Sequence, residues 1–337
     1  MPDEPDEYCD IDRCDVPKER RDALQRFRSR RRVWLSWLDT DEDHAIWRTL
    51  NALVWRDVAF KALTAFALCN DEIALHNPLV AEALINGHVA AHVLAIRRLT
   101  ERTPKERLSL RWLVSHLKKH IDLFTRENWV CYDGLPYDYQ VVRDAHFSKL
   151  AAKKEATVSF MWGATEGPEA DGASEIMHQH FDKLAGVDPA ARTREDRLRR
   201  DLLSTIDKWL DESGADDLAK WASTYLAHAG GPNERARLAD MEITSKKIAD
   251  AIKALARATE AISLFVYGGG RAGAVMPVAQ YNQFEKLDKP IIRHAGDENT
   301  GKDRWRSYSA IWDRCLDGVE DELLGRPGLS PSSITRS

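Results

Sequence analysis

The spacing of hydrophobic residues predicts helices along most of the chain. The clearest pattern lies in residues 234–266, where a row of mostly apolar residues recurs at alternating spacings of four and three: Ile248, Ile252, Leu255, Thr259, Ile262 and Val266. This spacing places one seam along a helix, which suits packing against an antiparallel neighbour. We expect that neighbour to be the helix of residues 217–231, so that the two form a helical hairpin within an all-α bundle.

The same periodicity predicts helices earlier in the chain. A widely apolar segment from Pro78 to about Arg98 begins with proline in its first turn, and we expect it to be central in the bundle. The apolar window from Val58 to Cys69 contains Lys61 and is much shorter than the roughly 20 residues that span a bilayer. A buried helix and no membrane association are therefore expected. Further helices are predicted over residues 18–37, 107–124, 141–162, 174–184, 193–210 and 303–323.

Aromatic and turn residues interrupt this pattern between residues 125 and 142. Asp133 and Gly134 separate two short aromatic runs, as in a small hairpin, although Pro136 disfavours a central strand. We interpret residues 125–175 as an irregular insertion. The predicted organisation is a flexible acidic arm (1–17), a basic N-terminal helix (18–40), a helical domain (41–266), an irregular connection (267–302), a C-terminal helix (303–323) and a disordered tail (324–337).

Composition narrows the class of protein without identifying a function. The chain has 337 residues, 43% of them hydrophobic, and a net charge of -5, so any contact with nucleic acid requires a local basic patch. The most basic stretch, residues 18–37, fits a phosphate-contacting edge, but an amphipathic helix with solvated or paired arginines is favoured. The acidic start lacks a secretory signal, and five cysteines without a CxxC pair fit reduced cytoplasmic thiols.

Histidine pairs are the first candidates for chemistry. His88 with His92, and His116 with His120, have the spacing that places two imidazoles on one helix face. Neither pair has the adjacent glutamate of a His-Glu-x-x-His zinc motif, and the third ligand is not evident. Glu175 and His178 form a single Glu-x-x-His, whereas di-iron bundles need two. Ordinary core or surface histidines are favoured, and no metal or other cofactor is expected. The glycine-rich run after residue 267 lacks the lysine of a phosphate loop and fits a helix terminator.

Two parts of the chain resemble a known family. Residues 93–100 (Val-Leu-Ala-Ile-Arg-Arg-Leu-Thr), followed by residues 108–113 (Leu-Ser-Leu-Arg-Trp-Leu), are similar to two adjacent helices of the bacterial abortive-infection (AbiU-type) branch of the HEPN superfamily. Residues 221–228 (Trp-Ala-Ser-Thr-Tyr-Leu-Ala-His) resemble the segment that precedes the last long helix of that family. The resemblance implies a HEPN-like bundle over residues 41–266 with extra flanking helices.

The family resemblance also implies a function. Active members cleave RNA with an arginine and a histidine four to six residues apart, and His228 matches the histidine. Histidine transfers protons near neutral pH, and arginine stabilises charge on phosphate. The arginine does not carry over, because Ala222 occupies its position; Lys220 is a nearby cation with poor spacing. Arg111 and His116 also have a suitable spacing, but in the wrong helix. The contacts to RNA or nucleotide are then assigned to Arg97, Arg98 and Tyr225.

The expected function is therefore that of a cytoplasmic phage-defence or toxin-type protein that acts on or binds RNA, either as a metal-independent ribonuclease or with that activity lost or altered. The resemblance further implies a homodimer or a protein partner from a defence or toxin system. The alternative is a non-catalytic helical module for protein interaction, which would use the many tryptophans, 11 in all, and the insertion.

Overall fold

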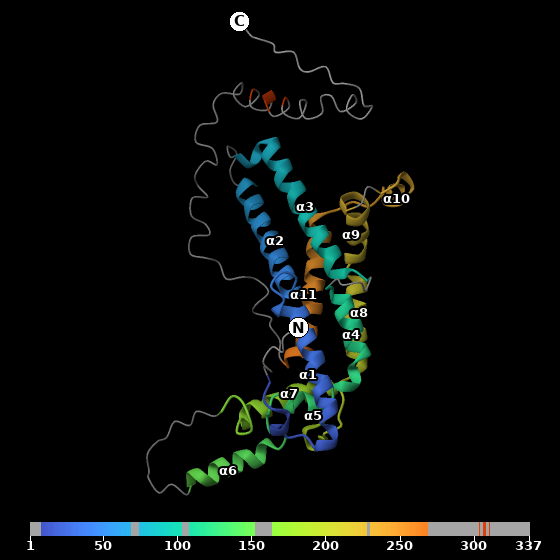
Figure 1. Ribbon diagram of the computed structural model, residues 1–337. Coiled ribbons are helices and arrows are strands. Elements are labelled where there is room, and N and C mark those ends of the chain that lie inside the picture. Colours follow the sequence, from blue (N-terminus) through green and yellow to red (C-terminus); the bar gives the residue numbers. More distant parts are fainter. Residues whose placement is uncertain are drawn as a thin grey trace, which may run out of the picture. The chain divides into compact units, whose positions relative to one another are not determined.

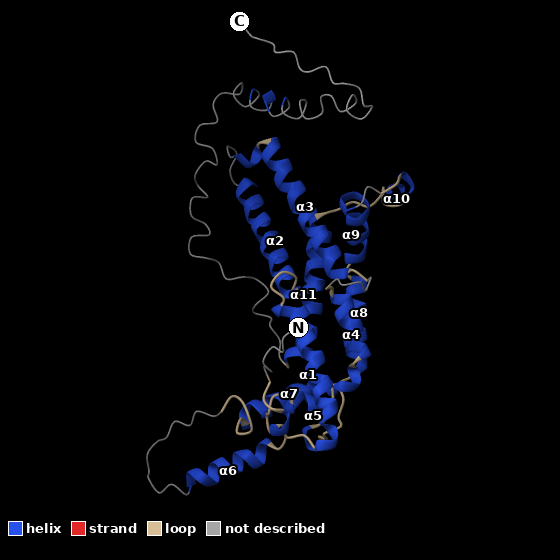
Figure 2. Cartoon of the chain, viewed as in Figure 1, coloured by secondary structure: helices blue, strands red, loops and turns tan. Residues whose placement is uncertain are grey.

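The computed structural model describes residues 8–68, 74–102, 108–151, 164–227 and 230–268, together with four helical positions, Asp303, Arg306, Ser307 and Ala310. The regular elements in these residues are helices, which confirms the predicted all-α class (Figures 1 and 2). Within them, the β-type pairing is one isolated bridge between Thr125 and Arg197. The helices up to residue 268 belong to one compact unit. The predicted connection, C-terminal helix and tail lie almost wholly outside the described residues.

Eleven α-helices are described. Their bounds are α1 (Arg21–Leu35), α2 (Ile46–Leu68), α3 (Pro78–Thr100), α4 (Leu110–Lys119), α5 (Arg126–Cys131), α6 (Tyr139–Ala151), α7 (Asp171–Ala185), α8 (Arg200–Glu212), α9 (Ala215–Ala222), α10 (Pro232–Ala236) and α11 (Ser245–Tyr267). Two π-helical turns, Ser36–Thr40 and Ser223–Ala227, extend α1 and α9. Short 3-10 turns lie at Ile11–Arg13, Lys18–Arg20, Ala74–His76, Ile121–Leu123 and Pro189–Ala191.

Helix α11 is the centre of the bundle. The side chain of Thr244 accepts a hydrogen bond from the Lys247 amide and caps its start, and Gly268, at φ +79°, ends it in the left-handed conformation. All six residues of the predicted seam are buried, which confirms the sequence pattern. The helix packs against α1, α2, α3, α4 and α8. The predicted hairpin partner is different, however: α9 packs chiefly along α3, with a smaller contact to α11.

The N-terminal arm is ordered from Tyr8 onward, contrary to the prediction of a loose segment over residues 1–17. Tyr8, Cys14 and Val16 are buried, and Cys14 and Val16 pack with Val130 and Cys131 of α5. Residues 1–7 lie outside the described part. These apolar contacts hold the arm against α5. They were not expected from the sequence because the segment as a whole is polar.

The arginines of α1 are partly structural, which corrects the prediction of a solvated or phosphate-contacting face. Arg28 and Arg31 are 2% and 7% exposed. The guanidinium of Arg31 lies 4.0 Å from the centroid of the Tyr132 ring, and its Nε donates to the Val266 carbonyl. Arg21 forms an ion pair with Asp12 of the acidic arm, which agrees with the prediction that some of these arginines are paired.

Residues 126–131 are helical, so the predicted hairpin is wrong. The Thr125 hydroxyl accepts a hydrogen bond from the Asn128 amide and caps α5, and all six residues of α5 are buried. The backbone of residues 194–198 pairs with the start of this helix: Arg126 N–H donates to the Asp196 carbonyl at 2.9 Å, and Leu198 N–H donates to the Phe124 carbonyl. This pairing also explains why α8 begins at Arg200 rather than near Thr193.

The outer parts of α2 and α3 are apolar but exposed, which corrects the prediction of a buried helix over residues 58–69. Figure 1 shows α2 and α3 extending side by side. Large exposed side chains on these two helices are Trp55, Val58, Phe66, Leu68, Leu79, Leu84, Ile85 and Leu94. Among the described helices, α3 alone has the length and apolarity of a membrane span, with 22% of the relevant window buried. One such helix is weak evidence, because core helices of soluble proteins also meet these criteria.

Candidate metal centre

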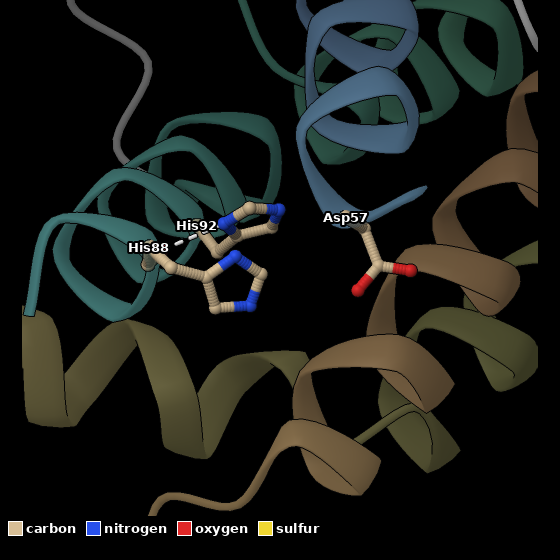
Figure 3. Close-up of side chains that lie close together, drawn as sticks. All are labelled: Asp57, His88 and His92. Carbon is tan, nitrogen blue, oxygen red and sulfur yellow. Dashed lines mark hydrogen bonds between the residues drawn. The ribbon is translucent and has the colours of Figure 1, made fainter. Parts of the chain in front are cut away.

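The His88 and His92 side chains lie on one face of α3, as their spacing predicted. Their ring centroids are 4.1 Å apart. The packing of α2 against α3 adds Asp57, the carboxylate that the sequence pattern lacked (Figure 3). One ring nitrogen from each histidine and one carboxylate oxygen all lie within 4.8 Å of one another. Asp57, His88 and His92, hereafter the α2–α3 cluster, are all buried.

His88 contributes a buried nitrogen that has no partner. Its Nε2 atom is buried and forms no hydrogen bond, and the residue as a whole is 9% exposed. The imidazole stacks on the Phe60 ring with centroids 3.9 Å apart. Burial, with a smaller contribution from His92, lowers the pKa of His88 to about 4. The ring is therefore neutral near pH 7, which leaves one nitrogen lone pair available to a ligand.

His92 faces two carbonyl oxygens. Its Nδ1 lies 2.7 Å from the His88 carbonyl, and its Nε2 lies 3.2 Å from the Leu53 carbonyl. An imidazole that coordinates a metal ion is neutral, so one of these nitrogens would keep its N–H and the other would offer its lone pair to the ion. The carbonyl of His88 is one turn earlier in the same helix, and a hydrogen bond to it would orient the ring and leave Nε2 as the ligand atom.

Asp57 completes a set of two imidazoles and one carboxylate. Its Oδ2 accepts a hydrogen bond from Lys61, one turn later on α2, and its side chain is 12% exposed. Two nitrogens and one oxygen suit Zn²⁺, Fe²⁺, Co²⁺ or Ni²⁺. Ligands of one such ion lie roughly 3–4 Å apart, since each bond is about 2.0–2.2 Å. Small side-chain rotations would bring the three groups onto a common ion, with Asp57 exchanging Lys61 for the metal.

The second histidine pair is arranged differently. The Trp34 indole donates to Nδ1 of His116 at 2.9 Å, which occupies one ring nitrogen. The rings of His116 and His120 meet edge to face at 4.6 Å. Among the described residues, the α2–α3 cluster is the one group of three side chains with metal-ligand spacing. Burial lowers the pKa of His116 to about 4, and the pKa of His120 is lowered as well.

The Glu-x-x-His sequence of α7 is structural. Glu175 forms an ion pair with Arg143. His178 is 2% exposed, and its Nε2 lies 2.9 Å from the Tyr137 carbonyl. Burial lowers the pKa of His178 to about 4, so the ring is neutral near pH 7. The two side chains therefore have separate partners rather than a shared ligand position.

The described residues that were assigned to RNA contact or cleavage lie on α3 and on residues 215–227, which comprise α9 and the π-helical turn after it and are hereafter the α9 segment. Arg98 donates to the His44 carbonyl at 3.3 Å, and Arg97 is half-buried on the same helix.

Lys220 forms an exposed ion pair with Asp217. The Tyr225 ring lies 5.1 Å from that of Trp221, and its hydroxyl donates to the Arg235 carbonyl. His228 lies outside the described residues.

Neither position considered for the cleavage arginine, 222 or 111, presents a free arginine side chain. Ala222 is fully buried, in the main core cluster. Arg111, the alternative partner by spacing, is 7% exposed and forms ion pairs with Asp211 and Asp216 at 2.8 and 2.9 Å. Arg111 therefore links α4 to α8 and α9 through these two ion pairs.

Comparison of the chain with protein-family models, with curated proteins and with solved structures finds no match. The HEPN-like assignment and the RNA-related function remain predictions from the sequence.

Proposed function

We propose that the protein binds a divalent transition-metal ion at the α2–α3 cluster and that the ion joins these two helices. The observation that carries this proposal is the partnerless, buried Nε2 of His88 beside a second imidazole and a carboxylate. A buried nitrogen without a hydrogen bond costs about 1–3 kcal/mol. Coordination of a metal ion by this group would offset that cost.

The location of the ligands gives the ion a mechanical role. His88 and His92 belong to α3, whereas Asp57 belongs to α2, so a bound ion would cross-link the helices in the region where their outer apolar parts begin. In the described residues α2 and α3 pack against each other there, and much of their surface is exposed. The metal would therefore restrict separation of the two helices.

Metal titration tests this proposal. Protein stripped with a chelator is titrated with Zn²⁺ by calorimetry and with Co²⁺ by visible absorption, and thermal unfolding is followed in parallel. One ion per chain and a rise in melting temperature are expected; at an ion concentration 100 times Kd, binding adds about 2.7 kcal/mol of stability. Asp57→Asn, His88→Gln and His92→Gln should each weaken binding at least tenfold.

Two further variants sharpen the test. His120→Gln alters the other histidine pair, which belongs to no three-ligand group among the described residues, and should leave binding unchanged. Lys61→Met removes the cation that competes for Asp57 and should strengthen binding severalfold. Equal affinity in the wild type and all three ligand variants would show that any bound ion lies elsewhere, and would refute the proposal.

We propose RNA binding by the α9 segment as a second candidate function. Tyr225 is 39% exposed beside Trp221, and the Lys220 side chain is 68% exposed. Exposed aromatic rings and cations along one segment are the groups that bind single-stranded RNA. In this proposal a cytoplasmic defence or toxin-type protein binds RNA as a homodimer or with a protein partner. The buried Ala222 supports binding without the Arg–His cleavage pair.

Fluorescence anisotropy with a labelled single-stranded RNA tests the second candidate. Tyr225→Leu should weaken binding about tenfold through loss of stacking, and Lys220→Gln should weaken it less and reduce the salt dependence. Incubation with total RNA, alongside His228→Ala, separates binding from cleavage. Unchanged affinity in Tyr225→Leu would exclude this segment as the RNA-binding surface.

The protein-interaction alternative remains a prediction. It is supported by the large apolar side chains that α2 and α3 expose, among them Trp55 and Phe66.

A further inference from the structure

Two cysteines of the N-terminal arm lie beside an arginine of α1. The Sγ atoms of Cys9 and Cys14 are 3.5 Å apart. Nη2 of Arg28 donates to Cys14 Sγ at 2.9 Å and lies 3.6 Å from Cys9 Sγ. A disulfide bond has an S–S distance of about 2.05 Å, so closing the remaining gap requires a small shift of one side chain.

The surroundings hold Cys9 in this position. Its backbone N–H donates to Asp133 Oδ1 at 2.9 Å. Gly134, at φ +79°, leaves the space that the sulfur occupies, since a Cβ atom there would lie 2.8 Å from Cys9 Sγ. Arg28 is fixed in turn because its Nε donates to the Tyr132 carbonyl at 2.7 Å. Residues 132–134 therefore position both the Cys9 side chain and the guanidinium of Arg28.

We propose that Cys9 and Cys14 form a thiol-oxidation site, in which a hydroperoxide converts the two thiols into a reversible disulfide with the assistance of Arg28. This site is distant in sequence from the α2–α3 cluster and does not depend on metal binding. Reversible disulfides of this kind occur in otherwise reducing compartments as redox sensors.

The two sulfurs have different roles in the reaction. Cys9 is half-buried, whereas Cys14 is 5% exposed and burial raises its pKa to about 12. Cys9, after losing its proton to solvent, attacks the peroxide, breaks the O–O bond and becomes a sulfenic acid. The departing oxygen leaves as water, or as an alcohol from an organic hydroperoxide, after gaining a proton. Arg28 stabilises the negative charge on sulfur.

The second step forms the bond. Cys14 loses its proton as its sulfur attacks Cys9, which displaces the sulfenic oxygen as a second water molecule. With hydrogen peroxide the net reaction consumes two thiols and one peroxide and yields one disulfide and two waters. Both sulfurs are oxidised and the peroxide is reduced. A dithiol reductant reverses the change.

Mass spectrometry of the full chain tests the proposal. Protein kept in chelator is exposed to hydrogen peroxide, alkylated and digested with trypsin, which cleaves after Arg13 between the two cysteines. The expected product is a peptide pair joined by a Cys9–Cys14 disulfide, absent after reduction. In Cys14→Ser, Cys9 should accumulate as a sulfenic acid that dimedone traps; in Cys9→Ser, Cys14 should stay reduced.

Variants of Arg28 test its assistance. Arg28→Gln should slow disulfide formation about tenfold, because it removes hydrogen bonds from a charged donor, and Arg28→Lys should restore part of the rate. Circular dichroism establishes that each variant is folded. Faster oxidation of Cys69, Cys131 or Cys315 with no Cys9–Cys14 link would overturn the proposal, and an unchanged rate in folded Arg28→Gln would overturn the role of the arginine.

Discussion

Two buried polar clusters in this protein differ in the chemistry of the atoms they leave unpaired. Around α5, the guanidinium of the fully buried Arg126 forms ion pairs with Asp182 at 2.7 Å and Asp196 at 2.9 Å. Its Nη2 has no partner, but that atom is a donor and does not bind metal. In the α2–α3 cluster the partnerless atom is an imidazole nitrogen. A neutral imidazole can coordinate an ion, so the first cluster indicates structure and the second a ligand site.

Loss of the Arg126 charge should have the largest effect. Arg126→Met leaves the Asp182 and Asp196 carboxylates buried with less positive charge beside them, and breaking a buried ion pair in this way costs about 3–5 kcal/mol. Chemical denaturation measures the change. Arg20→Met is the matched control: Arg20 also pairs with a buried carboxylate, Glu127, but its side chain is 41% exposed and Glu127 keeps Arg194. Comparable losses in the two variants would contradict the distinction.

The pH dependence of stability should separate the buried histidines from the carboxylates around Arg126. The pKa values of His88 and His178 are about 4 in the folded protein, below the ordinary value near 6.5. The unfolded chain therefore binds more protons between these values, and the free energy of unfolding falls as the pH falls from about 6.5 to 4. We expect about 1–2 kcal/mol from each histidine, after allowance for solvent screening.

The carboxylates around Arg126 should respond at lower pH. Burial opposes ionisation of Asp182, but hydrogen bonds from Arg192 and Arg126 hold its pKa below the ordinary value of 3.8. The stability from this pairing is present above about pH 4 and is lost as the pH falls further. Denaturation curves at pH 7, 5 and 3.5 resolve the two ranges. A constant free energy of unfolding between pH 7 and 5 would contradict the histidine assignment.

The sequence predicted what depends on local spacing. The seam of α11 and the shared face of His88 and His92 follow from helical periodicity, because both lie within one helix. Asp57 belongs to another helix, and its approach to the histidines depends on how α2 packs against α3. Its sequence signal was a charge immediately before the apolar window of residues 58–69, with Lys61 one turn later. That window was interpreted by composition alone as a buried helix.

Tertiary context also decided α5. The run Trp129-Val-Cys-Tyr132 has the composition of a strand, yet it is helical or follows a helix directly, and Trp129 and Val130 are fully buried. Contacts of α5 with α7 and with the arm supply this burial, and neither contact is visible in the local pattern. The aromatic and β-branched residues of this run are therefore explained by its burial, and they do not indicate a strand.

Replacement of His88 or His178 by phenylalanine should give small effects of opposite sign, which makes this the sharpest contrast between the two clusters. In metal-free protein, His88→Phe removes the nitrogen without a partner and keeps a ring to stack on Phe60, so the free energy of unfolding should rise by about 1 kcal/mol. His178→Phe should lower it by about 1–3 kcal/mol, because the Tyr137 carbonyl and Arg126 lose a hydrogen-bonding partner.

Denaturation in chelator, repeated with Zn²⁺, measures both changes. Zn²⁺ should stabilise the wild type and His178→Phe but not His88→Phe. A gain in apo stability at position 88, combined with loss of the response to metal, identifies a residue whose unpaired nitrogen is retained at a cost for binding an ion. A loss of stability in His88→Phe equal to that in His178→Phe would instead place both histidines among the structural polar groups of the core.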